Sequence, residues 1–227
     1  MVKGRVQCPA REVEHRASEA SCGASLLRSD VPHTEEVKRE FLQIITEESG
    51  KLQELVENLL DTSRIQAGAF IVDKKHINIE ELAKQIMVRA QTTTTRHLFL
   101  LEFDPLPEVQ ADPRRLEQVL QNLLDNAIKY SPNGGRITVT GKIEDHYIQI
   151  NVADEGPGIP ESEFKKIFEP FYRIPAPATQ QIRGAGLGLT ICRAIIEAHR
   201  GIIWAESVPG KGSVFSFTLP LREDSHE

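Results

Sequence analysis

From residue 69 onward, strand-like and helix-like segments follow one another in a mixed order that restricts the fold. Strand patterns occupy residues 70–79, 97–103, 136–144, 147–154, 201–207 and 213–220. Helical patterns occupy residues 79–91, 113–131 and 189–201. We therefore expect an α+β fold, a two-layer α/β sandwich in which helices cover one face of a mixed, largely antiparallel sheet.

The helix from residue 113 has a clear start signal. Asp112 is a favourable N-cap, and Pro113 suits the first helical position, where no backbone N–H is needed. Asn133, Gly134 and Gly135 then form a turn before the next strand.

A separate helical pattern covers residues 34–66. Thr34 can cap it, and Glu35 and Glu36 lie near its positive end, while Gly68 is a plausible stop. Its apolar residues recur at helical spacing: Phe41, Ile44, Ile45, Leu52, Leu55, Val56, Leu59 and Leu60. Because a lone helix would leave this stripe in water, we expect a partner helix, from this chain or from a second copy.

Charge and cysteine usage narrow the class of protein. The net charge of −6 disfavours a nucleic-acid partner, which would attract a basic surface. Cys8, Cys22 and Cys192 are odd in number and lack zinc spacing, so a reducing, cytoplasmic setting is expected. No apolar run approaches the ~20 residues that span a bilayer, although a membrane-anchored parent protein is compatible with this chain.

The first candidate motif lies on the helix from residue 113. Asn122 and Asn126 share one helix face, with Lys129 and Tyr130 one turn later. Their amide oxygens could meet a Mg²⁺ ion that carries phosphate oxygens, and the lysine could meet phosphate. The alternative is a solvated polar face opposite an apolar stripe.

The second motif is Asp154-Glu155-Gly156-Pro157-Gly158-Ile159-Pro160, directly after an apolar strand. A carboxylate at the end of a strand can accept a hydrogen bond from an exocyclic amine such as that of adenine, and glycines let backbone approach a planar ring. The alternative is an ordinary acidic, glycine-rich turn.

The third motif, Gly184-Ala185-Gly186-Leu187-Gly188-Leu189, opens the helix that follows it. Exposed backbone N–H groups at a helix N-terminus suit phosphate. The spacing fits neither the Rossmann fingerprint nor a P-loop.

In this order, the three motifs resemble the ATPase superfamily of DNA gyrase, the ninety-kilodalton heat-shock chaperone, mismatch-repair ATPases and histidine kinases. QNLLDNAIKYS resembles the N box, DEGPGIP the first glycine box and GAGLGLTICRAIIEAHRG the second. FEPFYRI, residues 168–174, resembles the F box of histidine kinases, and GKGSVFSFTLP resembles the closing strand. The resemblance covers roughly residues 70–221.

The resemblance implies a role for each matching position. Asn122 and Asn126 would hold Mg²⁺, Asp154 would take the adenine amine, and Thr218 would lie under the adenine. Residues 172–188 would form a lid, with Arg173 and Arg183 as candidate phosphate partners. The ATP-binding set is Asn122, Asn126, Lys129, Tyr130, Asp154, Gly156, Gly158, Ile159, Arg173, Gly184, Gly186, Leu187, Gly188 and Thr218.

The resemblance also implies a domain order. Residues 1–24 form a poorly defined N-terminus, residues 25–68 an incomplete dimerisation and phosphoacceptor segment, residues 69–222 the ATP-binding domain, and residues 223–227 a tail. The expected partners are ATP, a response-regulator receiver domain and a second copy of the chain, paired through the helix at 34–66.

The chain departs from the family at the phosphoacceptor. The usual histidine, followed by an acidic residue, is not found. His15, with Glu14 before it, is the candidate, and His33 lies in the predicted turn. We therefore expect an ATP-dependent histidine kinase core, with a nucleotide-binding dimerisation module without phosphoacceptor as the alternative. A gyrase-type ATPase that uses Glu117 as general base is a third possibility.

Overall fold

A computed structural model describes residues 34–67, 70–175 and 185–221. The chain divides into two compact units, Met1–Glu57 and Asn58–Glu227, so this division falls within a helix. Several expectations fall outside the described residues: His15, the loop 25–32, Gly68, Arg183 and Gly184.

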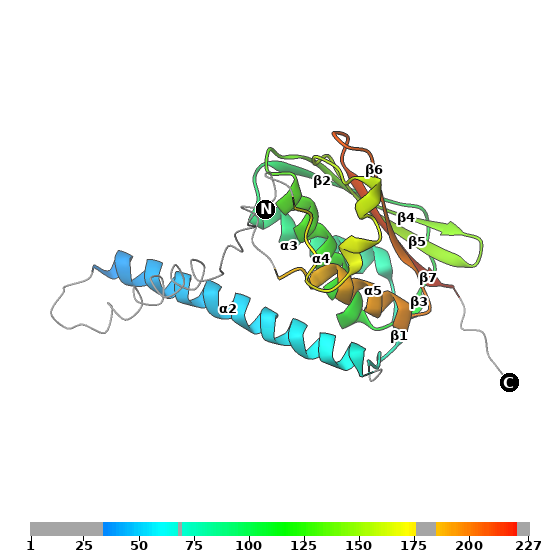
Figure 1. Ribbon diagram of the computed structural model, residues 1–227, viewed down its shortest axis with the longest axis horizontal. Coiled ribbons are helices and arrows are strands. Elements are labelled where there is room, and N and C mark those ends of the chain that lie inside the picture. The colour runs from blue at the N-terminus through cyan, green and yellow to red at the C-terminus, as the bar shows by residue number, and fades with distance from the viewer. Residues whose placement is uncertain (1–33, 68–69, 176–184, 222–227) are drawn as a thin grey trace, which may run out of the picture. The chain divides into compact units, whose positions relative to one another are not determined.

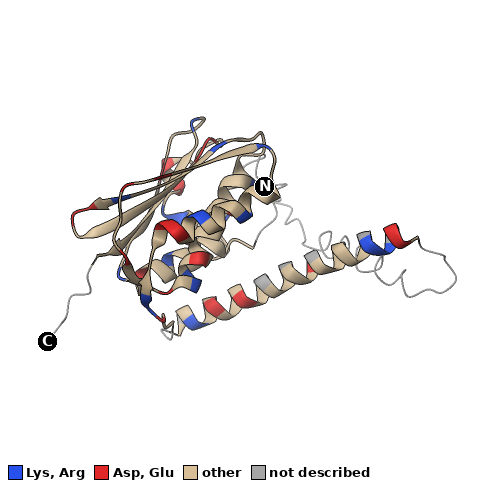
Figure 2. Cartoon of the chain, turned by 180° about the vertical axis from the view of Figure 1, so that it is seen from behind, with Lys and Arg blue, Asp and Glu red and all other residues tan. Residues whose placement is uncertain are grey.

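The long N-terminal helix α2 runs over Glu35–Gln66, as its sequence pattern predicts. The part of α2 in the first unit leaves large apolar side chains in solvent, among them Leu42, Ile44, Ile45, Leu52 and Val56. Acidic and basic side chains are interspersed along it (Figure 2). Its apolar stripe is thus available for a partner helix.

The second unit is built on a five-stranded sheet of order β2-β4-β5-β7-β6 (Figure 1). The strands are β2 (His97–Phe103), β4 (Gly135–Glu144), β5 (Tyr147–Asp154), β6 (Ile203–Ser207) and β7 (Ser213–Pro220). β2 pairs with β4 in parallel, and the remaining pairs are antiparallel. The sheet is therefore mixed and largely antiparallel, as expected.

Three helices lie against one face of this sheet: α3 (Ile79–Thr93), α4 (Pro113–Tyr130) and α5 (Gly188–Ala198) (Figure 1). α4 begins where the sequence predicts, because the Asp112 side chain accepts the backbone N–H groups of Arg114 and Arg115. The core forms where the helices meet the sheet, with Leu116, Leu120, Leu123, Ile150 and Phe217 fully buried. The burial of alternate residues on β4 and β5 fixes which strand face meets the helices.

Two short strands form a second sheet. β1 (Lys75–Ile77) pairs antiparallel with β3 (Val109–Ala111). β1 is shorter than the strand predicted at 70–79, and β3 was not predicted, because three residues carry too little periodicity. Two 3₁₀ helices, η1 (Glu161–Glu163) and η2 (Lys166–Phe168), precede α5.

Across the described residues, we find no helix with the length and hydropathy that crossing a membrane requires.

Candidate functional site

The Asn122 side chain of α4 lies against the start of α5. A Cβ atom added at Gly188 would lie 3.0 Å from Asn122 Oδ1, so a larger residue there would displace the amide by a few tenths of an ångström. The Asn122 side chain also hydrogen-bonds to the Cys192 thiol, whose pKa burial raises to about 12. The structure therefore brings the first and third motifs together around one amide.

Asp154 ends β5 and is buried, with 8% of its surface exposed. Its Oδ1 accepts the backbone N–H of Gly156 at 2.7 Å, and the backbone N–H of Ser213 is a second donor. Burial is the larger influence and raises the pKa of Asp154, while these two hydrogen bonds lower it. A buried carboxylate held by backbone in this way is a preorganised acceptor.

The end of α4 meets this carboxylate through Gly156. A Cβ atom at Gly156 would lie 2.6 Å from Asp154 Oδ1 and 2.8 Å from the Tyr130 carbonyl oxygen. Lys129, beside Tyr130, is exposed, and Asn126 is half-buried one turn earlier. The first and second motifs thus converge, although Tyr130 and Asp154 are 24 positions apart in the sequence.

The turn between β6 and β7 supports the loop after Asp154. The Gly210 N–H donates to the Pro157 carbonyl at 2.7 Å, and the Ile159 N–H donates to Ser207 Oγ at 2.8 Å. Gly158 adopts φ +76°, a left-handed conformation that favours glycine. These two bonds anchor the second motif to the turn between β6 and β7.

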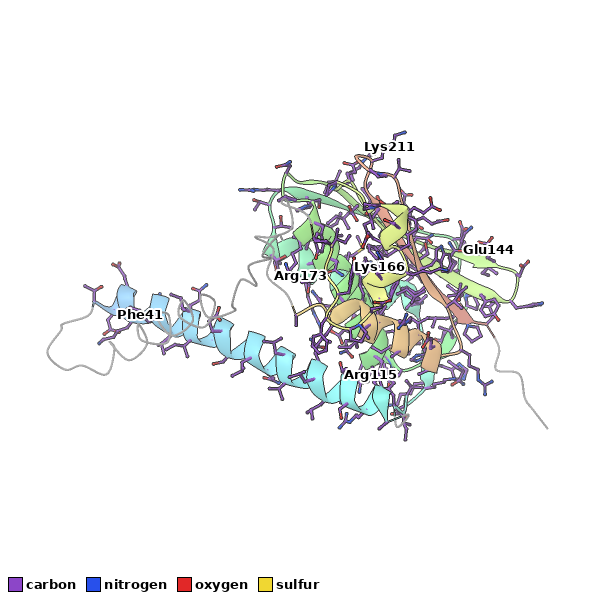
Figure 3. All side chains as sticks on the ribbon, viewed as in Figure 1. Phe41, Arg115, Glu144, Lys166, Arg173 and Lys211 are labelled. Carbon is purple, nitrogen blue, oxygen red and sulfur yellow. The ribbon has the colours of Figure 1, made fainter. Side chains whose placement is uncertain are left out.

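The remaining predicted residues lie around the start of α5. The Phe171 N–H donates to the Gly186 carbonyl at 2.9 Å, which ties the F-box segment to the third motif. Leu187 is buried and belongs to the hydrophobic core. Arg173 is exposed two residues beyond Phe171 (Figure 3).

The structure places Thr218 away from Asp154, the residue predicted to accept the adenine amine. In the β5–β7 ladder, Asp154 pairs with Ser213, whereas Thr218 pairs with Gln149. Thr218 lies five positions after Ser213 on β7, a distance of about 17 Å along the strand. Thr218 Oγ1 instead accepts the Ile202 N–H at 3.0 Å.

Ser213 is the hydroxyl residue at Asp154, and sequence reasoning missed it. Its backbone N–H binds the Asp154 carboxylate, and its Oγ lies 3.2 Å from the Ser207 hydroxyl. The signal that could have found it is the pair of glycines in Gly210-Lys211-Gly212, directly before it. Those glycines, at φ +81° and +92°, form the turn that brings β7 back to the end of β5.

The predicted magnesium ligands are amide oxygens and not a cluster of carboxylates. Across the described segments, no group of three or more His, Cys, Asp or Glu side chains is placed to hold a metal ion. Mg²⁺ usually takes few protein ligands beside phosphate oxygens and waters. Asn122 and Asn126, one turn apart on α4, fit that requirement.

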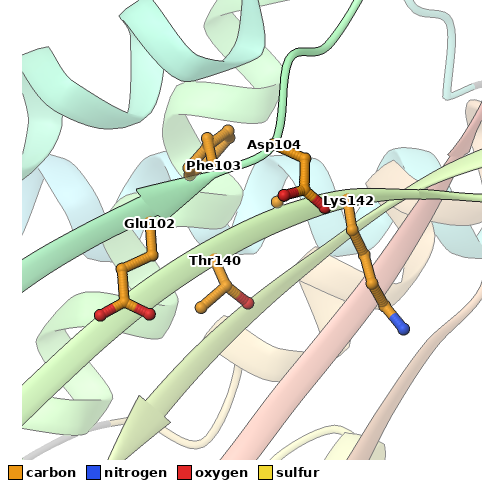
Figure 4. Close-up of a pocket in the computed structure, with 6 residues that line it drawn as sticks. Glu102, Phe103, Asp104, Thr140 and Lys142 are labelled. Carbon is orange, nitrogen blue, oxygen red and sulfur yellow. The ribbon is translucent and has the colours of Figure 1, made fainter.

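A cavity of about 310 Å³ lies at another place, by the β2–β4 edge of the sheet (Figure 4). Its lining consists of Glu102, Phe103, Asp104, Thr140, Gly141 and Lys142. None of the predicted nucleotide-binding residues lines this cavity.

Comparison with known proteins identifies the family. A family model described as "Histidine kinase-, DNA gyrase B-, and HSP90-like ATPase" matches residues 111–223. A solved structure of the catalytic domain of the histidine kinase ThkA is 35% identical, with a TM-score of 0.58, and the match covers 66% of this chain and 96% of that domain. The chain belongs to the histidine kinase family.

Longer relatives extend the match of this histidine kinase beyond its ATPase domain. Sensor histidine kinase WalK of Bacillus subtilis is 35% identical over 82% of this chain and 31% of WalK. Adaptive-response sensory kinase SasA of Synechocystis sp. is 39% identical over 75% of this chain and 45% of SasA. The chain thus spans less than half the length of either relative.

Two further solved structures match almost the whole chain. ShkA, solved in complex with AMPPNP, has a TM-score of 0.70 at 28% identity, covering 96% of this chain and 46% of ShkA. ThkA, solved in complex with the response regulator TrrA, has a TM-score of 0.66 at 28% identity, covering 96% of this chain and 62% of ThkA. Both comparisons include the helix before the ATPase domain of this histidine kinase.

Proposed function

We propose that this histidine kinase core binds Mg-ATP and transfers the γ-phosphoryl group to a histidine, and from there to a response-regulator aspartate. The observation that carries the proposal is the convergence of α4, the end of β5 and the start of α5. It places Asn122 against Gly188, and Gly156 between Asp154 and Tyr130. The family membership and the AMPPNP and TrrA complexes of similar kinases support it.

Different residues of the chain would bind the adenine and the magnesium ion. The Asp154 carboxylate would accept the adenine amine, with Gly156 and Ser213 as its backbone donors. Asn122 and Asn126 would hold Mg²⁺ by their amide oxygens. Bound there, magnesium would neutralise phosphate charge during transfer.

The transfer needs little covalent chemistry from the protein. An imidazole nitrogen of the acceptor histidine would attack the γ-phosphorus as the bond to the bridging oxygen breaks, leaving ADP. The protein's task is to hold the nucleotide in line with that nitrogen. His15, with Glu14 before it, is the proposed acceptor on this chain, or a partner supplies one.

Further proposals concern the assembly. We infer a homodimer through the helix at 34–66, because its apolar stripe is exposed in the first unit. We also infer a cytoplasmic site of action, where ATP and response regulators are present. Residues 25–68 would serve the dimerisation and phosphoacceptor role, and 69–222 the nucleotide-binding role.

The gyrase-type alternative lacks support at its key residue. Glu117 Oε1 accepts from Arg89 Nη1 of α3 at 2.5 Å, a pair that is largely exposed. Glu117 and Asn122 are five residues apart, which separates their side chains by about 140° around the helix. Glu117 is therefore not placed on the Asn122 face, where it would activate a water molecule.

Incubation with ATP labelled at the γ-phosphate tests the proposal. We expect acid-labile, base-stable label on the protein, and calorimetric binding that requires magnesium for full affinity. Binding without label would favour the nucleotide-binding module, and steady phosphate release without label would favour an ATPase. A folded chain without nucleotide binding would overturn the proposal.

A further inference from the structure

The last turns of α2, from Asn58 on, bury their polar side and expose their apolar side. Asp61 and Thr62 are only 4% and 7% exposed, whereas Leu59 and Leu60 are 52% and 54% exposed. These turns belong to the second unit, together with the ATPase domain. A buried carboxylate at this place must be compensated, because an unpaired charge away from water is costly.

The Asp61 carboxylate is held by two side chains of α4. Arg115 Nη1 donates to Oδ2 at 2.6 Å and Nη2 donates to Oδ1 at 3.1 Å, a two-pronged geometry that lysine cannot reproduce. Gln118 Nε2 adds a longer bond to Oδ2 at 3.3 Å. These three hydrogen bonds fix both the distance and the orientation of the Asp61 carboxylate relative to α4.

Arg115, labelled in Figure 3, is itself fixed by further contacts. Its guanidinium lies 4.7 Å from the centre of the Phe70 ring, in the connection between α2 and the sheet, and its Nη1 also donates to Gln118 Oε1 at 2.9 Å. The Arg115 backbone N–H is bound by the Asp112 cap. The arginine is therefore a rigid partner for the carboxylate.

The same face of α4 carries this contact and the proposed metal site. Arg115, Gln118 and Asn122 are spaced at i, i+3 and i+7, so they form one row along the helix. Gln118 lies one turn from Asn122, about 6 Å along the axis. A displacement of α4 relative to Asp61 would move Asn122 and the bound phosphates with it.

We propose that Asp61 is a positioning residue for phosphoryl transfer: the Asp61–Arg115–Gln118 contact, which we call the latch, holds the nucleotide site in one register against the last turns of α2. This inference rests on the proposed function. Asp61, Arg115 and Gln118 are not among the residues predicted to bind ATP, so loss of the latch should change where the phosphate is presented and not how tightly nucleotide binds.

The test uses the whole 227-residue chain. Asp61→Asn removes the charge, and Arg115→Lys keeps the charge but removes the two-pronged geometry. Glu117→Gln is the matched control, because it breaks an exposed ion pair on the same helix. Hydrogen exchange of residues 58–67, the affinity for MgATP and the rate of labelling at saturating MgATP are measured for each.

We expect exchange at 58–67 to be at least tenfold faster in Asp61→Asn and Arg115→Lys, with the Kd for MgATP within threefold of wild type and the labelling rate changed at least tenfold. Glu117→Gln should match wild type throughout. Wild-type exchange in both latch variants, or a parallel loss of nucleotide affinity, would overturn the inference. If Asp61→Asn does not fold, the Arg115→Lys variant alone provides the test.

Absence of nucleotide binding in the wild type would instead count against the proposed function alone, because the exchange comparison needs no nucleotide.

Discussion

Asp154 Oδ1 accepts the backbone N–H of Gly156 at 2.7 Å, so the carboxylate at the end of β5 is oriented by its own loop. The loop after it is held in turn by Gly210 and Ser207 of the neighbouring hairpin. This orientation exists before any ligand arrives, which reduces the ordering cost of binding.

The first prediction concerns that carboxylate. Asp154→Asn should weaken ATP and ADP binding by about 10- to 100-fold, because a hydrogen bond to a charged group contributes about 1.5–3 kcal/mol. Calorimetry measures the loss. Asp145→Asn, on the exposed β4–β5 turn, is the control and should bind as wild type. Equal affinities for the two variants would contradict the assignment.

The second prediction is the pH dependence of the same contact. Because burial raises the pKa of Asp154, its carboxylate takes up a proton at a higher pH than an ordinary aspartate. In the proposed site the ionised carboxylate would accept the adenine amine, so affinity should be complete well above that pKa and fall as the pH drops through it. Titration of metal-free ADP binding from pH 7.5 to 4.5 measures this, and the ratio of wild type to Asp154→Asn should shrink toward acid pH.

The third prediction separates the two hydroxyl residues of β7. Ser213→Ala should weaken nucleotide binding by about three- to tenfold, because the hydroxyl beside Asp154 would supply one hydrogen bond near the adenine. Thr218→Val should leave affinity unchanged but lower stability by about 1 kcal/mol, because it removes the bond from the Ile202 N–H. Calorimetry and urea unfolding on both variants test the pair, and the reverse pattern would restore Thr218 to the site.

The fourth prediction concerns the close approach of α5 to α4. Gly188→Ala adds a methyl 3.0 Å from Asn122 Oδ1, which must move by a few tenths of an ångström. Alanine favours helix over glycine by up to about 1 kcal/mol, which should offset the cost of displacing the amide, so thermal stability should change little. MgATP affinity should nevertheless fall several-fold. Gly50→Ala, with open space around it in α2, is the control. Unchanged MgATP affinity would separate Asn122 from the metal site.

The fifth prediction is a pH dependence of stability. His199 is 1% exposed; its Nε2 accepts the Asp112 N–H at 2.9 Å, and its Nδ1 lies 2.7 Å from the Ile195 carbonyl. Burial lowers its pKa, so the unfolded chain takes up a proton before the folded one does. The free energy of unfolding should therefore be highest above about pH 6.5, the unfolded value, and decline as the pH falls from there toward the lowered pKa.

Urea unfolding at pH 7.5 and 5.5 measures that decline. His199→Gln cannot titrate and should show a smaller difference between the two pH values. His146→Gln, in the exposed β4–β5 turn, should keep the wild-type difference. If the free energy of unfolding declined equally in wild type, His199→Gln and His146→Gln, titratable groups other than His199 would be responsible.

Local chemistry in the sequence determined much of this protein. Asp112 and Pro113 set the start of α4, and alternation set the strands β4 and β5. That the three motifs lie at one site was implied by their resemblance to the ATPase superfamily. The start of the helix and the two strands depend on residues close together in the chain, so a local sequence pattern is enough to predict them.

Tertiary structure decided what depends on pairing between distant segments. The register of β5 on β7 set Ser213, and not Thr218, beside Asp154, and a shift along a strand leaves no mark in its alternation. The burial of Asp61 likewise reflects Arg115, 54 residues away, since a polar residue on a helix looks solvated until its partner is known. Local rules describe each element, but only packing fixes which residues meet.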